Sequence, residues 1–282
     1  MANAVAQGVS IQVQGLCRFS VPCTGGFKKY HTSLTERRAA LYAPARLDAR
    51  CLWFEHIGLP ALVHQTDPDF TLHMVLGEDL PNPWRDRIAG LIAPVPQIVP
   101  HWRAPGDHRA ICREILQKAR DPSRGVVAEF RLDDDDAIAV DYVAQLRRAW
   151  PKLARLSGPN GRIALDHERG MVVQAHADGR IETHTLLTHC WSAGLALFLR
   201  SDDPAIIMDF PHQKIWQRVP FVNLTEQLMF IRGDHATNDA RTPFAAAARV
   251  DVPDADIDAL MRRRFGVDIG AFRAAWCGLT AR

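Results

Sequence analysis

An α/β fold with a mostly parallel central sheet is predicted by three features of the 282-residue sequence. Strand-like and helix-like segments alternate along the N-terminal half. A run of apolar residues typical of a buried strand, Val126–Leu132, ends abruptly in four aspartates. Beyond a break at residues 157–161 the segments become shorter strands, which favours a smaller mixed sheet in the C-terminal half.

The N-terminal half supplies the central elements in order. A strand is predicted at Val9–Val21, because its apolar residues alternate until Pro22 and Gly25-Gly26. Apolar residues three or four positions apart then predict an amphipathic helix over residues 47–62, which Pro60 is expected to kink or restart. The elements that follow are strand Phe70–Leu76, helix Pro83–Ile92, strand Gln97–Val99, helix His108–Ala119 and strand Val126–Leu132.

The C-terminal half begins after one more helix. Asp141 is expected to cap this helix, and Pro151 to mark its end. Three short strands follow, and two short helices are predicted from Pro253 onward. Because the chain contains no internal repeat and no long linker, we expect a single domain over residues 1–282. Its short strands are predicted at Ile163–Asp166, Met171–Gln174 and Leu195–Leu199.

The composition is that of an ordinary globular protein. With 34 Lys and Arg against 32 Asp and Glu, the net charge of +2 excludes a protein that coats nucleic acid or acidic membranes. The six cysteines form no C-x-x-C pair and are expected to be reduced thiols. The N-terminus has no basic residue before Arg18, and the longest apolar stretch, Cys190–Leu199, is about half of a membrane span. These features predict a cytoplasmic protein without a membrane span.

The four consecutive aspartates, Asp133–Asp136, are the strongest chemical signal. On an extended backbone, Asp133 and Asp135 would share one side, about 6–7 Å apart. Such a pair would repel by roughly 2–3 kcal/mol at an effective dielectric constant near 20, so the run requires either full solvation or a cation. Since ligands bind at the carboxyl edge of such sheets, we expect a Mg²⁺ or Mn²⁺ site; a solvated loop or an acidic helix start is the alternative.

A strand that ends in Asp-x-Asp resembles the GT-A glycosyltransferases. More narrowly, several segments in order resemble the bacterial rhamnosyltransferase family, over roughly residues 10–275. They are Gly15–Ser20, Leu59–Phe70, Gly77–Pro81, Arg131–Ala137 and Ile231–Asp239. The resemblance implies a GT-A-like fold, with donor binding by residues 9–150, acceptor binding by residues 160–250 and C-terminal helices over residues 253–282. It also implies a divalent metal, a nucleotide-sugar donor (dTDP-rhamnose or a UDP-sugar) and a glycan or other hydroxyl acceptor.

The resemblance also implies roles for individual residues. Asp133 and Asp135 would hold the metal and the donor diphosphate, with Asp134 and Asp136 as second choices. Arg18 would approach the nucleotide or diphosphate; otherwise it is a surface arginine. Among the more peripheral candidates, Glu78 or Asp79 would contact base or ribose, and His235 would be a late metal ligand, unless these three are ordinary loop residues.

An inverting transfer requires a general base that takes the proton of the acceptor hydroxyl. Asp209 and His212 are the candidates, because they lie in the half expected to bind the acceptor, beside Trp216. The competing interpretation is a packed segment with solvated polar residues. A retaining mechanism would need no such base, and the residues leave this choice open.

Two other functions fit an acidic cluster at a strand end. A metal-dependent phosphoryl hydrolase uses such clusters, although the run here lies in the middle of the chain and not on the first strand. A non-catalytic sugar-nucleotide-binding protein on the same fold is the second alternative. A serine hydrolase is disfavoured, because Cys190–Gly194 lacks the first glycine of a nucleophile elbow and precedes a strand.

Overall fold

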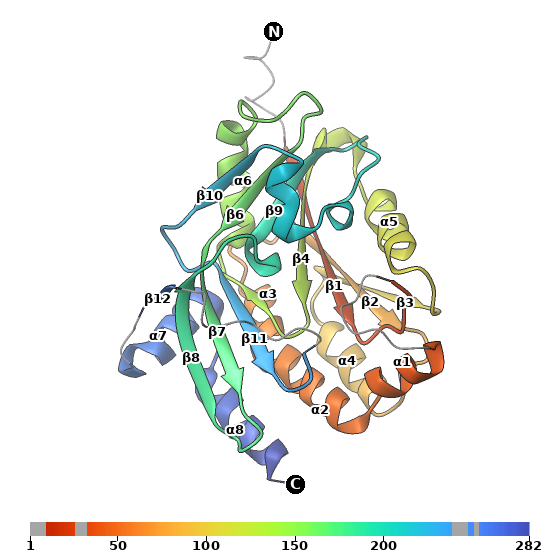
Figure 1. Cartoon of the computed structure of the whole chain (residues 1–282), viewed down its shortest axis with the longest axis vertical. Coiled ribbons are helices and arrows are strands. Elements are labelled where there is room, and N and C mark those ends of the chain that lie inside the picture. The colour runs from red at the N-terminus through yellow and green to blue at the C-terminus, as the bar shows by residue number, and fades with distance from the viewer. Residues whose placement is uncertain (1–9, 26–32, 239–247, 251–253, 282) are drawn as a thin grey trace.

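The computed structural model describes residues 10–25, 33–238, 248–250 and 254–281 (Figure 1). Of the features expected from the sequence, Val9, Gly26, Asp239 and Pro253 lie outside these residues. Within them, no helix is both long enough and apolar enough to cross a membrane. All six cysteines are free thiols, and five of them are buried.

A seven-stranded sheet with the order β10-β6-β9-β4-β1-β2-β3 forms the centre of the molecule. The pairs β1–β2, β1–β4, β2–β3 and β6–β10 are parallel, and β9 runs antiparallel to β4 and β6. The expected α/β class with a mostly parallel sheet is therefore confirmed. Its strands are β1 (Ile11–Phe19), β2 (Thr71–Gly77), β3 (Ile98–Arg103), β4 (Val126–Asp133), β6 (Ile163–His167), β9 (Leu195–Arg200) and β10 (Phe221–Leu224).

Helices cover both faces of this sheet, because alternate apolar residues of β1 and β4 point to opposite sides. On one face lie the buried side of α5 (His108–Lys118) and the segment around residues 206–219, which pack against apolar side chains of the sheet, including Leu197 of β9. The other face packs against a larger set of helices. They are α2 (Pro44–Trp53), the π-helical turn Phe54–Gly58, α3 (Leu59–Val63), α4 (Trp84–Ile92) and α6 (Tyr142–Leu153).

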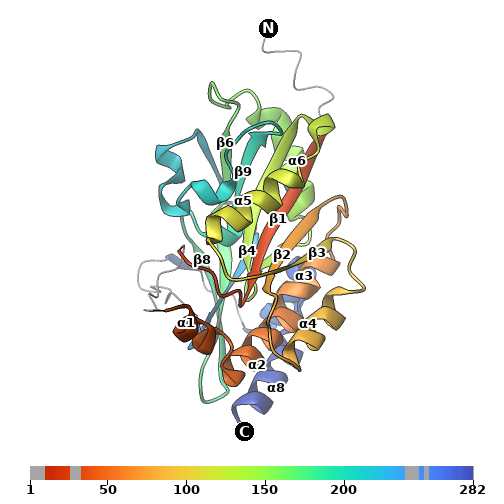
Figure 2. The ribbon, with the colours of Figure 1, turned by 90° about the vertical axis from the view of Figure 1, so that its right-hand side faces the viewer.

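A second, mixed sheet with the order β12-β8-β7-β11-β5 confirms the smaller sheet expected for the C-terminal half. Among the described residues, the chain enters it three times from the central sheet, from β4 into β5, from β6 into β7 and from β10 into β11. The C-terminal helix α8 packs on α2 (Figure 2). At this contact, the ring centroids of Trp53 and Phe272 lie 4.6 Å apart. The remaining elements are β5 (Ala137–Ile138), β7 (Arg169–Ala175), β8 (Ile181–Leu187), β11 (Phe230–His235), β12 (Ala248–Val250), α1 (Leu34–Leu41), α7 (Asp254–Phe265) and α8 (Ile269–Thr280).

Two of three local expectations need correction. Pro151 does not end α6, which continues to Leu153. Asp141 occupies the N-cap position, but its carboxylate accepts hydrogen bonds from Arg264 and Gln145 and caps no backbone N–H. Pro60 lies in the first turn of α3, directly after the π-helical turn, so the expected restart of the helix is confirmed.

The pH dependence of stability should reflect His73 of β2, which is 4% exposed and shares a hydrogen bond of 3.1 Å with His101 of β3. Burial, and secondarily the charge of His101, lowers the pKa of His73 from 6.5 to about 4. The unfolded chain therefore takes up this proton first as the pH falls below 6.5. The contribution of neutral His73 to the free energy of unfolding is complete above pH 6.5, and about 3 kcal/mol of it is lost by pH 4.

Urea unfolding at pH 7 and pH 4.5 checks this expectation. The His73→Gln variant, which keeps a polar partner for His101, should lose less stability between the two pH values than the wild-type chain. An equal loss in both proteins would show that His73 is not the group responsible.

Candidate active site

The four aspartates lie where the chain passes from β4 of the central sheet to β5 of the second sheet. Asp133 is the last residue of β4, and the backbone N–H of Asp136 donates to the carbonyl of Asp133 at 3.0 Å, which closes a turn. The strictly alternating arrangement expected for an extended run is therefore wrong. The turn brings oxygen atoms of Asp133, Asp135 and Asp136 within 4.8 Å of one another. Figure 1 shows β1, β4 and β11 all pointing toward α2, where this turn lies.

Burial differs sharply along the turn. The side chain of Asp133 is 31% exposed, whereas those of Asp134, Asp135 and Asp136 are at most 1% exposed. A fully solvated acidic loop is thus excluded. Asp133 is the member of the run that a ligand in solvent can reach.

Arginines neutralise the buried carboxylates. From the sequence, we expected full solvation or a bound Mg²⁺ or Mn²⁺ and did not consider arginine side chains. Arg50 of α2 donates from Nε to Asp134 at 3.0 Å and from Nη1 to Asp135 at 2.8 Å. Arg232 of β11 donates to Asp136 at 2.9 Å and to Asp133 at 3.2 Å. The third, Arg18 at the end of β1, donates to Asp133 at 3.0 Å.

These contacts decide the protonation of the cluster. Burial alone would raise the pKa of Asp133 and of Asp135, but the nearby arginines hold both well below the usual range. Burial raises the pKa of Asp136 to about 8, although Arg232 and the backbone N–H of Gly233 oppose this shift. The arginines therefore favour the anionic forms of Asp133 and Asp135.

His235, which the resemblance implied as a late metal ligand, contacts Asp135 as a fully buried side chain and is not among the grouped aspartate ligands. Its Nε2 lies 3.1 Å from Asp135 Oδ2, and its ring stacks on Trp53 at 4.9 Å. On the other side of the ring, Nδ1 shares a hydrogen bond of 2.8 Å with Thr237. Asn238 also donates to Asp135 Oδ2, at 2.6 Å. Asp135 is thus held from α2 and from the end of β11.

The residues implied for the base and ribose follow β2 at the same edge of the sheet. Asp79 accepts a hydrogen bond from the Tyr42 hydroxyl at 2.7 Å and pairs with Arg38 of α1. Glu78 is exposed, and its carbonyl accepts a hydrogen bond from Arg85. The structure therefore ties Asp79 to α1 and leaves the Glu78 carboxylate exposed.

The two candidate bases lie on the segment that follows β9. Arg113 of α5 donates from its two terminal nitrogens, Nη1 and Nη2, to the carboxylate of Asp209. The Nδ1 of His212 lies 2.7 Å from the carbonyl oxygen of Cys190. Arg131 of β4 links this segment to the aspartates. Its Nη1 lies 3.9 Å from the sulfur of Met208, and its charge acts on Asp133.

Sequence reasoning missed Arg50, Arg232 and Asn238. Arg50 carries a recognisable signal, because it lies between Leu47 and Phe54 on the buried face of an amphipathic helix, where an arginine needs an anionic partner. Arg232 and Asn238 lie inside the segment Ile231–Asp239, which was noted for its resemblance and not for its charges.

The donor atoms suit a hard divalent cation. Asp133, Asp135 and Asp136 offer carboxylate oxygens, the ligands that Mg²⁺ and Mn²⁺ prefer, and Asp133 keeps exposed surface for a ligand that brings phosphate oxygens. The residues present therefore fit such an ion.

The comparisons with known proteins follow this geometry. A family model described as "Putative rhamnosyl transferase" matches residues 12–247, which include the aspartate turn and all its arginine partners. The chain belongs to this family. No curated protein gives a significant match.

Solved structures similar to this member of the rhamnosyl transferase family include three of TarS from S. aureus. The first covers 79% of this chain at 11% identity, with a TM-score of 0.39. TarS residues 1–349 match with a TM-score of 0.36 at 10% identity, and the same fragment in complex with UDP with 0.37 at 11%. The chain covers 37% of the first of these proteins and 60% of the other two.

Proposed function

We propose that this family member is a metal-dependent glycosyltransferase. It would move a sugar, rhamnose from dTDP-rhamnose or the sugar of a UDP-sugar, to a glycan or other hydroxyl acceptor. The observation that carries this proposal is the cluster of Asp133, Asp135 and Asp136 at the carboxyl edge of a parallel sheet, within a chain of the rhamnosyl transferase family.

The charges around Asp133 suit a nucleoside diphosphate. Arg18 and Arg232 both contact this carboxylate, and Arg131 acts on it electrostatically. Burial lowers the pKa of Arg131 to about 10, and its Nε has no hydrogen-bond partner among the described residues. Three guanidinium groups around one partly exposed carboxylate suit the two phosphates of a donor, because each phosphate accepts bidentate hydrogen bonds from an arginine.

The metal, when bound, would neutralise the diphosphate as it leaves. Asp133 and Asp135 would hold it, while Arg50, His235 and Asn238 keep Asp135 in place. Glu78 and Asp79, which follow β2 at the same edge, remain the proposed contacts of the base and ribose.

For the acceptor, the geometry favours His212 over Asp209 as the base. The two terminal nitrogens of Arg113, Nη1 and Nη2, each donate to one oxygen of Asp209 and stabilise its anionic form. In His212, an Nδ1–H donor to the Cys190 carbonyl leaves the lone pair on Nε2. That nitrogen is the one proposed to take the proton of the acceptor hydroxyl.

Binding and turnover of nucleotide-sugars test the proposal. UDP and dTDP, with and without Mn²⁺, are titrated into the wild-type chain, and release of nucleotide diphosphate from their sugars is followed. The Asp133→Asn variant should lower metal-dependent affinity and turnover by about 100-fold, equivalent to about 3 kcal/mol. Because Asp133 also pairs with Arg18 and Arg232, the melting temperature of the variant is measured too, and binding is compared at a temperature at which both proteins are folded.

Asp202→Asn is the matched control, because Asp202 is an exposed aspartate paired with Arg200 at the far end of β9. It should leave affinity and turnover unchanged. Unchanged nucleotide binding in Asp133→Asn would refute the site. Hydrolysis of simple phosphate esters without use of nucleotide-sugars would favour a phosphoryl hydrolase, and metal-dependent binding without turnover would favour a non-catalytic protein.

A further inference from the structure

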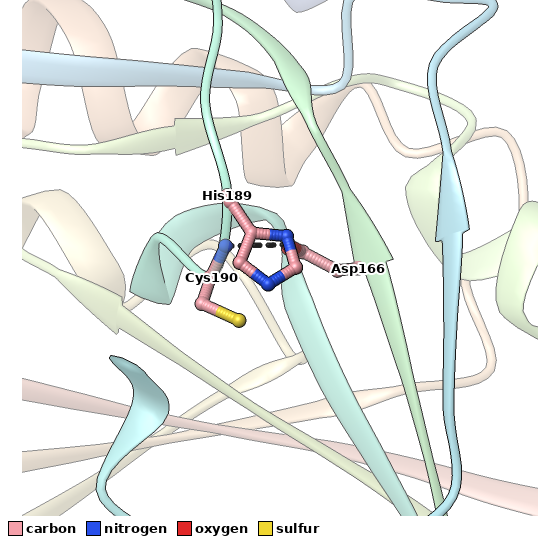
Figure 3. A group of neighbouring side chains, drawn as sticks. All are labelled: Asp166, His189 and Cys190. Carbon is pink, nitrogen blue, oxygen red and sulfur yellow. Dashed lines mark hydrogen bonds and ion pairs between the residues drawn. The ribbon is translucent and has the colours of Figure 1, made fainter. Parts of the chain in front are cut away.

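A second cluster of potential metal ligands lies where the chain passes from β6 toward β7. Asp166 is in β6, and His189 and Cys190 lie in the loop between β8 and β9. One ligand atom of each lies within 4.8 Å of the others. Figure 3 shows Asp166 pointing from its strand toward His189 and Cys190. None of the proposed donor or acceptor roles uses these three side chains.

The carboxylate of Asp166 is only partly satisfied. Its side chain is 1% exposed, and Oδ2 accepts a hydrogen bond of 2.6 Å from the backbone N–H of Cys190. Oδ1 is buried without a hydrogen-bond partner among the described residues. The one ion-pair partner that the described residues provide is His189, 4.0 Å away. A buried carboxylate oxygen in this state is unfavourable, unless a cation or a proton joins it.

The imidazole beside it is held in place and reaches solvent. His189 is 49% exposed, and its Nδ1 lies 2.7 Å from Glu168 Oε1. The side chain of Asn223 donates to the same oxygen at 2.6 Å. A carboxylate that orients an imidazole in this way is the usual support of a metal-bound histidine. The exposed edge of the ring provides the path by which an ion enters.

Cys190 adds a soft ligand to the nitrogen and the oxygen. The thiol is buried beside the Asp166 carboxylate that its own backbone N–H binds. The acidic turn offers oxygen ligands from three aspartates, which suit Mg²⁺ or Mn²⁺. A set of one sulfur, one nitrogen and one oxygen instead suits a borderline-soft ion such as Zn²⁺.

We propose that Asp166, His189 and Cys190 bind a zinc-type divalent cation, with Glu168 as the positioning residue of the imidazole. On binding, the Cys190 thiol releases its proton to the solvent and the thiolate sulfur coordinates the ion. Three protein ligands leave a fourth position for water. The ion ties the loop before β9 to β6, and because the Cys190 carbonyl is the partner of His212, it also steadies that histidine.

Cobalt substitution of the full chain tests this site without any assay of activity. Co²⁺ bound to a thiolate gives a sulfur-to-metal charge-transfer absorption, which oxygen ligands alone do not produce. We expect this band to saturate at about one Co²⁺ per chain and Zn²⁺ to displace it. Cys190→Ser should abolish the band and weaken Zn²⁺ binding by about 10-fold or more.

Two controls keep the outcome interpretable. Cys277→Ser removes an exposed free thiol and should keep the band, and so should Asp133→Asn, which alters the partly exposed carboxylate of the acidic turn. If Cys190→Ser does not fold, as judged by circular dichroism, His189→Gln replaces it, because this half-exposed side chain can be changed without a cavity. No thiolate band in the wild type, or an unchanged band in both variants, would refute the site, whatever the result with nucleotide-sugars.

Discussion

Arg50→Ala should lower the free energy of unfolding by about 3–5 kcal/mol. The guanidinium of Arg50 is 9% exposed and contacts Asp134 and Asp135, whose side chains are each 1% exposed. Removing it leaves two buried carboxylates without their principal cation. The loss should therefore greatly exceed that of an ordinary surface pair, and urea unfolding followed by circular dichroism measures it.

Arg200→Ala is the control for Arg50. Arg200 and Asp202 form an ion pair of 2.7 Å in which both side chains are more than 60% exposed, so its loss should leave the free energy of unfolding close to that of the wild type. Equal effects of the two substitutions would contradict the role of Arg50. A double variant, Arg50→Ala with Asp134→Asn, should recover part of the loss, because it removes one of the stranded charges.

Gly233→Ala should destabilise the chain by about 3 kcal/mol and should also weaken nucleotide binding. A Cβ atom built on Gly233 of β11 would lie 2.5 Å from the backbone carbonyl oxygen of Asp135 and 3.0 Å from its Cβ. Because backbone lies in the way, the clash cannot be relieved by a side-chain rotation. The aspartate turn itself has to move, and the hydrogen bond of 3.1 Å from Gly233 N–H to Asp136 moves with it.

Gly90→Ala provides the matched control. Gly90 lies within α4, is exposed, and its Cβ would meet no atom within 4 Å. The same substitution should there raise stability by roughly 0.5–1 kcal/mol, since alanine favours a helix more than glycine does. Thermal unfolding and UDP titration of both variants separate the outcomes. A Gly233→Ala variant with wild-type stability and binding would show that the close approach to the turn is unimportant.

The elements of the central sheet were predictable because their signals are local. The apolar run Val126–Leu132 and the alternation after Gly8 correspond to β4 and β1, and the expected helices at residues 83–92 and 108–119 correspond to α4 and α5. Pro151 shows where a local signal failed. Proline disfavours a helix interior, yet Trp150 and Leu153 are buried on the same helix, and their packing outweighs the loss of one hydrogen bond.

The candidate site was predictable only in part. The aspartate run marks the site by itself, since four consecutive carboxylates after an apolar strand require partners. Which partners they find is not a local property. Asp133 is partly exposed and Asp136 is buried because the run forms a turn between two different sheets. The residues of the run do not indicate that β5 belongs to the second sheet.

By itself, the sequence determined the α/β class, the order of the main elements, the location of the acidic site and the family resemblance, because these depend on short-range periodicity and on motifs. Only the tertiary structure decided that arginines hold the aspartates. Arg50 lies 84 residues before Asp134, and Arg232 lies 96 residues after Asp136. The physical reason is that carboxylates that leave water must be matched by cations, which here come from distant parts of the chain.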